Sequence, residues 1–186
     1  ERYLYSCYAY IPNPRHATAS LDFLTGDDVV TPWEHETFGK FAQGNYTPSN
    51  PYINYWHDLF KGIRQCYLLK ENLGSVPGLS DELKAAYDAE ADFLIAFYHF
   101  YLLRMYGPIP LVKENLPIGS SSEEVRVYRD TFDDCVDYIC QLCEEAIPDL
   151  PLSITDVINE MGRITRPIAA TLLAEARVTG ASPLFN

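Results

Sequence analysis

The sequence is poor in basic residues, with 14 lysines and arginines against 26 aspartates and glutamates and a formal net charge of −12. No cluster of lysine or arginine stands out, so nothing resembles the basic footprint of a protein that binds nucleic acid or an anionic membrane surface. The longest apolar run, residues 93–106, falls short of the roughly 20 residues needed to span a bilayer. The chain shows no signal peptide, and since it starts at Glu1, we expect any targeting sequence to lie upstream.

The sequence also lacks the common catalytic motifs: it has no G-x-S-x-G elbow, no Walker loop, no H-E-x-x-H and no G-x-G-x-x-G. It therefore predicts no enzyme, no catalytic residue and no cofactor. Its five cysteines cannot all pair with one another, so a disulfide scaffold is not expected, and Cys7 and Cys66 stand alone. Cys135, Cys140 and Cys143 share one predicted helix; a zinc site would need a fourth ligand, so we predict buried thiols and no metal site.

Apolar residues at three- and four-residue steps predict helices, which glycine and proline separate. Ser80 and Thr131 are the expected N-caps, and Gly107-Pro108 should end the longest helix. His99 lies in the apolar second half of that helix, so we expect a hydrogen-bonded core histidine rather than a catalytic base. The predicted helices span residues 2–11, about 51–74, 81–106, 131–147 and 167–180.

The last four of these helices form two successive pairs, at about 51–106 and 131–180. This predicts an all-α fold of tetratricopeptide-like antiparallel helix pairs, in which each pair buries its face against the next. The W-x₂-L-G-x₂-Y consensus of tetratricopeptide repeats is absent, so the prediction depends on the pairing of the helices alone.

A long irregular segment, residues 25–50, precedes the first pair and is rich in aromatic residues. Loops of this length in compact domains are usually functional. Aromatic faces can cover the C–H surface of a sugar ring while polar neighbours bind its hydroxyls, but the rings could equally fold inward and anchor the loop. Solvated loop carboxylates are far commoner than a glycosidase pair built from Asp27-Asp28 and Glu34/Glu36. The candidate ligand-binding residues are Trp33 and Tyr46 as stacking faces, with Asp28, Glu34, His35 and Asn45 as hydrogen-bond partners.

Residues 89–112, AEADFLIAFYHFYLLRMYGPIPLV, resemble the hallmark A-E-A-x-F-L-R-A-x-x-Y-F-x-L-x-x-x-Y-G-x-[IV]-P-L-V of the SusD/RagB family. Residues 56–73 resemble the W-x-x-[LY]-[YF]-x-x-I-x-x-x-N helix of that family, and residues 162–165 and 181–186 resemble its G-R-[AI]-[ST] and A-S-P-L-F-N segments. Tyr67 stands where the family usually has Asn, and Ile95 where it usually has Arg.

The resemblance implies an outer-membrane, surface-exposed lipoprotein whose lipid anchor lies upstream and whose C-terminal part lies beyond this chain, so that residues 1–186 form the N-terminal part of a SusD-like domain. Such proteins capture oligosaccharides or polysaccharides, or occasionally other nutrients, together with a SusC-like TonB-dependent transporter. No fixed ligand motif accompanies the family, so the resemblance assigns no binding residue. The rival interpretation is a helical-repeat module that binds other proteins and no small molecule.

Overall fold

The computed structural model describes residues 1–12, 44, 47, 49, 51, 54–117, 119–123 and 125–185. The chain divides into two compact units, one made of Glu1–Tyr10 with Leu59–Asn186 and the other of Ile11–Asp58. Among the described residues of the smaller unit, the hydroxyls of Thr47 and Ser49 lie 3.2 Å apart. Among the described residues, almost all of the helical ones belong to the larger unit. The helices that the described residues form are α1 (Arg2–Tyr8), α4 (Trp56–Leu73), α5 (Asp81–Tyr106), α6 (Phe132–Ala146) and α7 (Arg166–Gly180).

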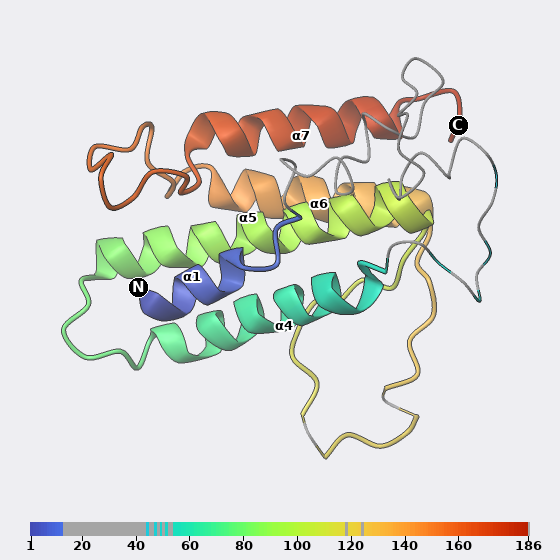
Figure 1. Ribbon diagram of the computed structural model, residues 1–186, viewed down its shortest axis with the longest axis horizontal. Coiled ribbons are helices and arrows are strands. Elements are labelled where there is room, and N and C mark those ends of the chain that lie inside the picture. Colours follow the sequence, from blue (N-terminus) through green and yellow to red (C-terminus); the bar gives the residue numbers. More distant parts are fainter. Residues whose placement is uncertain are drawn as a thin grey trace, which may run out of the picture. The chain divides into compact units, whose positions relative to one another are not determined.

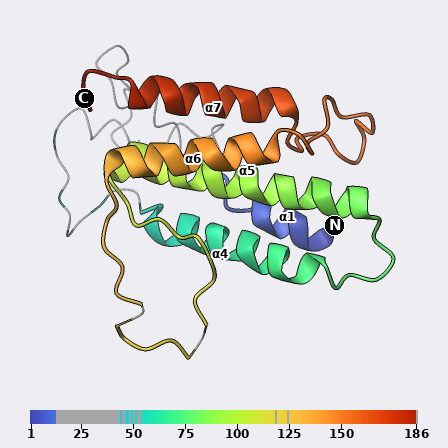
Figure 2. The same cartoon turned by 180° about the vertical axis from the view of Figure 1, so that it is seen from behind.

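The four long helices lie side by side in chain order, and consecutive helices run antiparallel (Figures 1 and 2). Helix α1 lies alongside α4 and α5 in both views. This arrangement confirms the predicted all-α fold of tetratricopeptide-like antiparallel helix pairs.

The helix ends follow the expected capping chemistry. The Ser80 hydroxyl accepts a hydrogen bond from the Leu83 N–H at 3.3 Å, and the Thr131 hydroxyl accepts one from the Asp134 N–H at 3.1 Å. Gly107 adopts a φ of 68°, a conformation that favours glycine, and its N–H donates to the Leu103 carbonyl at 3.0 Å.

Two predicted boundaries are wrong. Helix α1 ends at Tyr8 rather than at residue 11, because Pro12 has no N–H to donate to the Tyr8 carbonyl and disfavours a helical residue before it. Helix α4 begins at Trp56 rather than near Pro51. The first buried side chain of this helix is Leu59, and the described residues Pro51 and Asn54 before the helix are exposed, so no burial of these two residues favours an earlier start.

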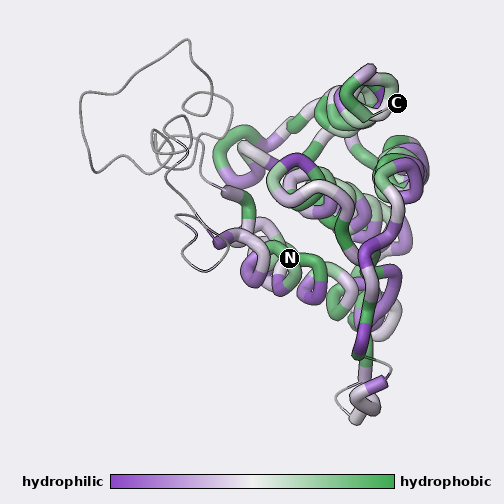
Figure 3. Tube along the Cα trace, turned by 90° about the vertical axis from the view of Figure 1, so that its right-hand side faces the viewer, coloured by the Kyte–Doolittle hydropathy of each residue, from purple (hydrophilic) through white to green (hydrophobic). Residues whose placement is uncertain are grey.

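Helix α5 is the centre of the larger unit, as its sequence predicts. Every residue from Ala89 to Ala96 is buried, and Tyr98, His99 and Leu102 have no exposed surface at all. The hydropathy view looks along the helices and shows green and purple residues alternating within each coil, as expected where one side of a helix packs and the other faces solvent (Figure 3). Despite its apolar character, α5 does not qualify as a membrane span, and neither does any other helix among the described residues.

Candidate functional site

All of the ligand-binding candidates from the loop fall outside the described residues, as do the carboxylates considered for a glycosidase pair. The candidates are Asp28, Trp33, Glu34, His35, Asn45 and Tyr46. Their role stays a prediction, and the described residues supply two other features: hollows along α6 and a buried polar network around α5.

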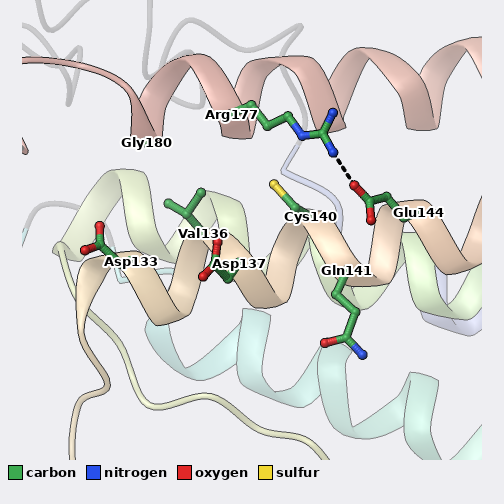
Figure 4. A pocket seen from close by; sticks show the side chains of 8 residues that line it. All are labelled: Asp133, Val136, Asp137, Cys140, Gln141, Glu144, Arg177 and Gly180. Carbon is green, nitrogen blue, oxygen red and sulfur yellow. Dashed lines mark hydrogen bonds and ion pairs between the residues drawn. The ribbon is translucent and has the colours of Figure 1, made fainter.

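The larger hollow lies between α6 and α7 and has a volume of about 680 Å³. The Arg177 guanidinium reaches from α7 to the Glu144 carboxylate on α6 and forms an ion pair with it, while Cys140 also projects towards α7 (Figure 4). Gly180 allows the close approach of the two helices, since a Cβ there would lie 2.9 Å from Val136 Cγ1. The remaining lining residues are Asp133, Asp137 and Gln141.

A smaller hollow of about 330 Å³ lies on the neighbouring face of α6 and shares Asp137 and Gln141 with the first. Tyr138 is the one aromatic ring among its described lining residues, and the Lys113 ammonium lies 5.3 Å from the centre of that ring. The same ring also makes an edge-to-face contact with His99, with centroids 5.5 Å apart. Carboxylates and an amide in these hollows could accept hydrogen bonds from hydroxyls, but the stacking face that a sugar favours is already occupied.

The polar side of α6 is not among the sites predicted from the sequence, in which the apolar stripe of this helix is the stronger signal. Asp133, Asp137, Gln141 and Glu144 recur at three- and four-residue steps opposite that stripe, and this spacing alone places them on one exposed face. The hollow beside them arises from the packing of α7, for which the sequence carries no comparable signal.

The predictions for His99 and for the cysteines of α6 concern described residues. His99 is fully buried; its Nδ1 lies 2.8 Å from the Ile95 carbonyl, and its Nε2 accepts from the Val112 N–H at 3.2 Å. Burial lowers the pKa of His99 to about 4, so the ring is a neutral core histidine, as predicted. Cys135 and Cys143 are buried thiols, and Cys140 is half-buried. Across the described residues, no group of three or more histidine, cysteine, aspartate or glutamate side chains could hold a metal ion.

The most unusual buried group is Glu90 in α5, a carboxylate with no exposed surface. Arg163, in the connection before α7, makes a two-point ion pair with it, and the Arg163 Nε lies 3.1 Å from Glu90 Oε1. The Tyr8 hydroxyl donates to the other carboxylate oxygen and accepts from the Ile164 N–H at 3.1 Å. Burial and the neighbouring Glu90 carboxylate raise the pKa of Tyr8, which keeps the phenol a donor.

This network joins two of the segments that carry the family resemblance. Glu90 belongs to the A-E-A start of the hallmark helix and Arg163 to the G-R-[AI]-[ST] segment, and the fold joins them. Val112, at the far end of the hallmark, binds His99 through its N–H and accepts from the Tyr67 hydroxyl at 2.9 Å. Tyr67 is thus bound to the backbone although it departs from the usual Asn. These residues contact one another and hold the helices together.

Comparison with known proteins assigns the family. The profile described as "Starch-binding associating with outer membrane", of the SusD-like type, matches residues 8–178. The chain belongs to the SusD-like family. Proteins of this family bind carbohydrate at the cell surface and are not enzymes.

Solved SusD-like structures share the fold. The protein BT4246 aligns with a TM-score of 0.87 and 33% identity over 100% of this chain and 31% of its own. A SusD superfamily protein from Parabacteroides distasonis ATCC 8503 has a TM-score of 0.76 and 25% identity over 98% of this chain and 39% of its own. A laminarin-binding SusD-like protein has a TM-score of 0.68 and 27% identity over 76% of this chain and 30% of its own.

The chain therefore spans only about a third of the length of the SusD-like proteins that it resembles. No curated protein sequence matches it at a significant level.

Proposed function

We propose that this chain is the N-terminal part of a cell-surface glycan-binding protein that acts with a SusC-like TonB-dependent transporter in oligosaccharide uptake. The single observation that carries the proposal is the SusD-like family match over residues 8–178. The similarity to a laminarin-binding SusD-like protein, at 27% identity, agrees with a carbohydrate ligand. In this proposal, a lipid anchor upstream of the chain holds the protein at the outer membrane.

Within this function, the helix pairs are the scaffold and the loop at residues 25–50 contacts the ligand. The reasons are chemical. In the hallmark helix, buried polar groups such as Glu90 contact other residues of the fold, here Arg163. The loop, in contrast, combines aromatic residues with polar side chains. We assign stacking to Trp33 and Tyr46, and hydrogen bonding to Asp28, Glu34, His35 and Asn45. The protein beyond this chain supplies the rest of the site.

The stacking assignment is tested in the full-length protein. A glycan array first identifies a ligand, and calorimetry then compares Trp33→Ala with Tyr128→Ala, a substitution of an aromatic side chain that is 86% exposed. Loss of one stacking face should weaken binding by about tenfold, while the control binds as the wild type does. Equal affinity of Trp33→Ala and wild type for a proven ligand would remove Trp33 from the site.

The partnership is tested separately. The full-length protein, isolated from outer membranes in mild detergent, should bring down a TonB-dependent transporter that mass spectrometry identifies. The rival interpretation is a helical-repeat module that binds other proteins. It is correct if the full-length protein binds no glycan on the array and instead forms a stable complex with a protein other than such a transporter.

A further inference from the structure

Helix α7 lies at one edge of the row of four long helices, and α4 lies at the other edge (Figures 1 and 2). In a stack of helix pairs, each inner helix packs between two neighbours, whereas a helix at the end of the stack needs a polar outer side to stay soluble. The exposed sides of α4 and α7 therefore indicate which edge of the row ends in water and which edge lacks a neighbour.

The exposed side of α4 is polar. It carries four exposed side chains at steps of four, three and seven residues, which place them on one face of the helix: His57, Lys61, Arg64 and Glu71. Water solvates such side chains well, and leaving them exposed costs no apolar burial. This edge of the row is suited to end in water.

The exposed side of α7 is apolar. Its members recur at three- and four-residue steps and are all exposed: Ile168, Thr171, Ala174 and Val178, here called the outer face of α7. The Val178 side chain is 72% exposed and that of Ile168 is 43% exposed. The Thr171 hydroxyl donates to the Pro167 carbonyl at 2.7 Å within the helix, so it needs no partner outside it.

The charged residues of α7 are directed away from its outer face. The Arg166 Nε donates to a backbone carbonyl before the helix at 2.7 Å. Glu175 Oε1 lies 3.6 Å from an Arg104 nitrogen on α5, and Arg177 pairs with Glu144 on α6 (Figure 4). Since the charges of α7 are used in contacts with the helices already present, its outer face has the character of an interface.

The length of the related proteins indicates what covers this face. This chain spans about a third of the SusD-like proteins that share its fold, so most of their length lies outside the aligned part. In this chain, each long helix lies beside the next one in the sequence (Figure 1). We propose that a further helix of the same protein, C-terminal to Asn186, packs on the outer face of α7. The proposal shares with the proposed function only the premise that this chain is the N-terminal part of a longer protein.

The outer face also defines the helix that fits it. From Ile168 to Val178 the face is about 15 Å long, so the partner helix needs about three turns to cover it. Thr171 and Ala174 are small and lie between the two larger side chains, which allows the helix axes to approach closely. The partner must present apolar side chains at three- and four-residue steps, because a charge buried there would lack a counter-charge on α7.

Thiol labelling of the full-length protein tests whether the outer face is covered. Val178→Cys and the matched control Lys61→Cys, on the exposed side of α4, are treated with N-ethylmaleimide in the folded state and in urea. Mass spectrometry follows the labelled peptides, so the native cysteines do not interfere. We expect Val178→Cys to react about tenfold more slowly in the folded protein than in urea, whereas Lys61→Cys reacts at similar rates in both. Equal rates for Val178→Cys would mean that the face is open to water and would overturn the proposal.

Photocrosslinking identifies the neighbour. The photoreactive amino acid p-benzoylphenylalanine, placed at position 171 of the full-length protein, should cross-link within one chain to a peptide C-terminal to residue 186. A cross-link to the Ile11–Asp58 unit, to a second copy or to another protein would overturn the proposal, as would the absence of any cross-link in the folded protein. If the bulky probe prevents folding, the labelling rates of Val178→Cys decide. Glycan binding is measured separately on the array, so the proposed function and this packing can fail independently.

Discussion

The two halves of α5 hold their neighbours by different chemistry. In the N-terminal half, the charged Glu90 binds Arg163 and Tyr8, which come from segments far away along the chain. In the C-terminal half, the neutral His99 binds Val112, which lies only 13 residues further on, while the Tyr67 hydroxyl reaches the Val112 carbonyl. One network is charged and long-range, and the other is neutral and mostly serves the backbone just after the helix.

This difference separates two tasks within one helix. A buried ion pair loses much of its attraction to the cost of removing both charges from water, so it adds modest net stability but strongly penalises any structure that leaves one charge alone. Glu90 and Arg163 therefore specify how α1, α5 and the start of α7 fit together. Breaking a neutral hydrogen bond costs less than leaving a buried charge unpaired. The neutral hydrogen bonds here satisfy the N–H and carbonyl of Val112, which lies outside the helices.

The largest effect is expected where the charged network is broken on one side. Arg163→Met leaves the fully buried Glu90 carboxylate without its cation, which should lower the free energy of unfolding by about 3–5 kcal/mol. Urea denaturation followed by circular dichroism measures this loss. The matched control is Arg177→Met, since the Arg177–Glu144 pair has side chains that are 61% and 51% exposed and should contribute less than about 1 kcal/mol.

A double variant separates the effect of the buried charge from the effect of side-chain packing in this network. In E90Q/R163M the buried charge is gone while the Gln oxygen can still accept from Tyr8, so part of the stability lost in Arg163→Met should return. If the double variant loses as much free energy of unfolding as Arg163→Met and Glu90→Gln lose together, the contacts act through packing and the proposed role of the ion pair is wrong.

The free energy of unfolding should decrease in acid because of His99 in the neutral network. The folded pKa of His99 is about 4 against an ordinary value of 6.5, so the unfolded chain takes up the proton first. Stability is therefore complete above about pH 6.5 and falls by about 3 kcal/mol as the pH drops to 4. Chemical denaturation at a series of pH values measures the slope.

The control for this slope is His99→Asn, whose amide can still donate to the Ile95 carbonyl but does not titrate. Its stability at pH 7 should be lower, because the Val112 N–H loses its acceptor, while the loss between pH 6.5 and 4 should be much smaller than in wild type. Burial also raises the pKa of Asp92, which titrates in both proteins and cancels in the comparison. Parallel pH profiles would show that His99 is not the group responsible.

Much of this fold could be predicted from the sequence because local signals agree with the tertiary structure. Ser80, Thr131 and Gly107 cap or end helices through contacts within a few residues, and the apolar run of α5 needs burial on every side. The beginning of α4 and the end of α1 were harder to predict, since helix ends depend on what packs there as much as on propensity.

The contacts that matter most for the site and its scaffold are long-range, and the sequence of one chain does not show them. No signal in the sequence near Glu90 identifies Arg163 as its partner. The hollow beside Arg177 likewise depends on the packing of α7 against α6. The role of the aromatic loop remains a prediction from its chemistry.

The smallest loss of stability is expected for substitutions of the two tyrosines near the Val112 carbonyl in the neutral network. Tyr67→Phe removes the 2.9 Å hydrogen bond to the Val112 carbonyl, but the Tyr138 hydroxyl lies 3.4 Å from the same oxygen and can donate to it. The loss should therefore be only about 0.5–1 kcal/mol. Tyr138→Phe should cost as little, because Tyr67 still serves Val112. The double variant leaves the carbonyl without either hydroxyl, so its loss should exceed the sum of the single losses when the urea midpoints are compared. Strict additivity would mean that the two tyrosines act independently and that Val112 does not share them.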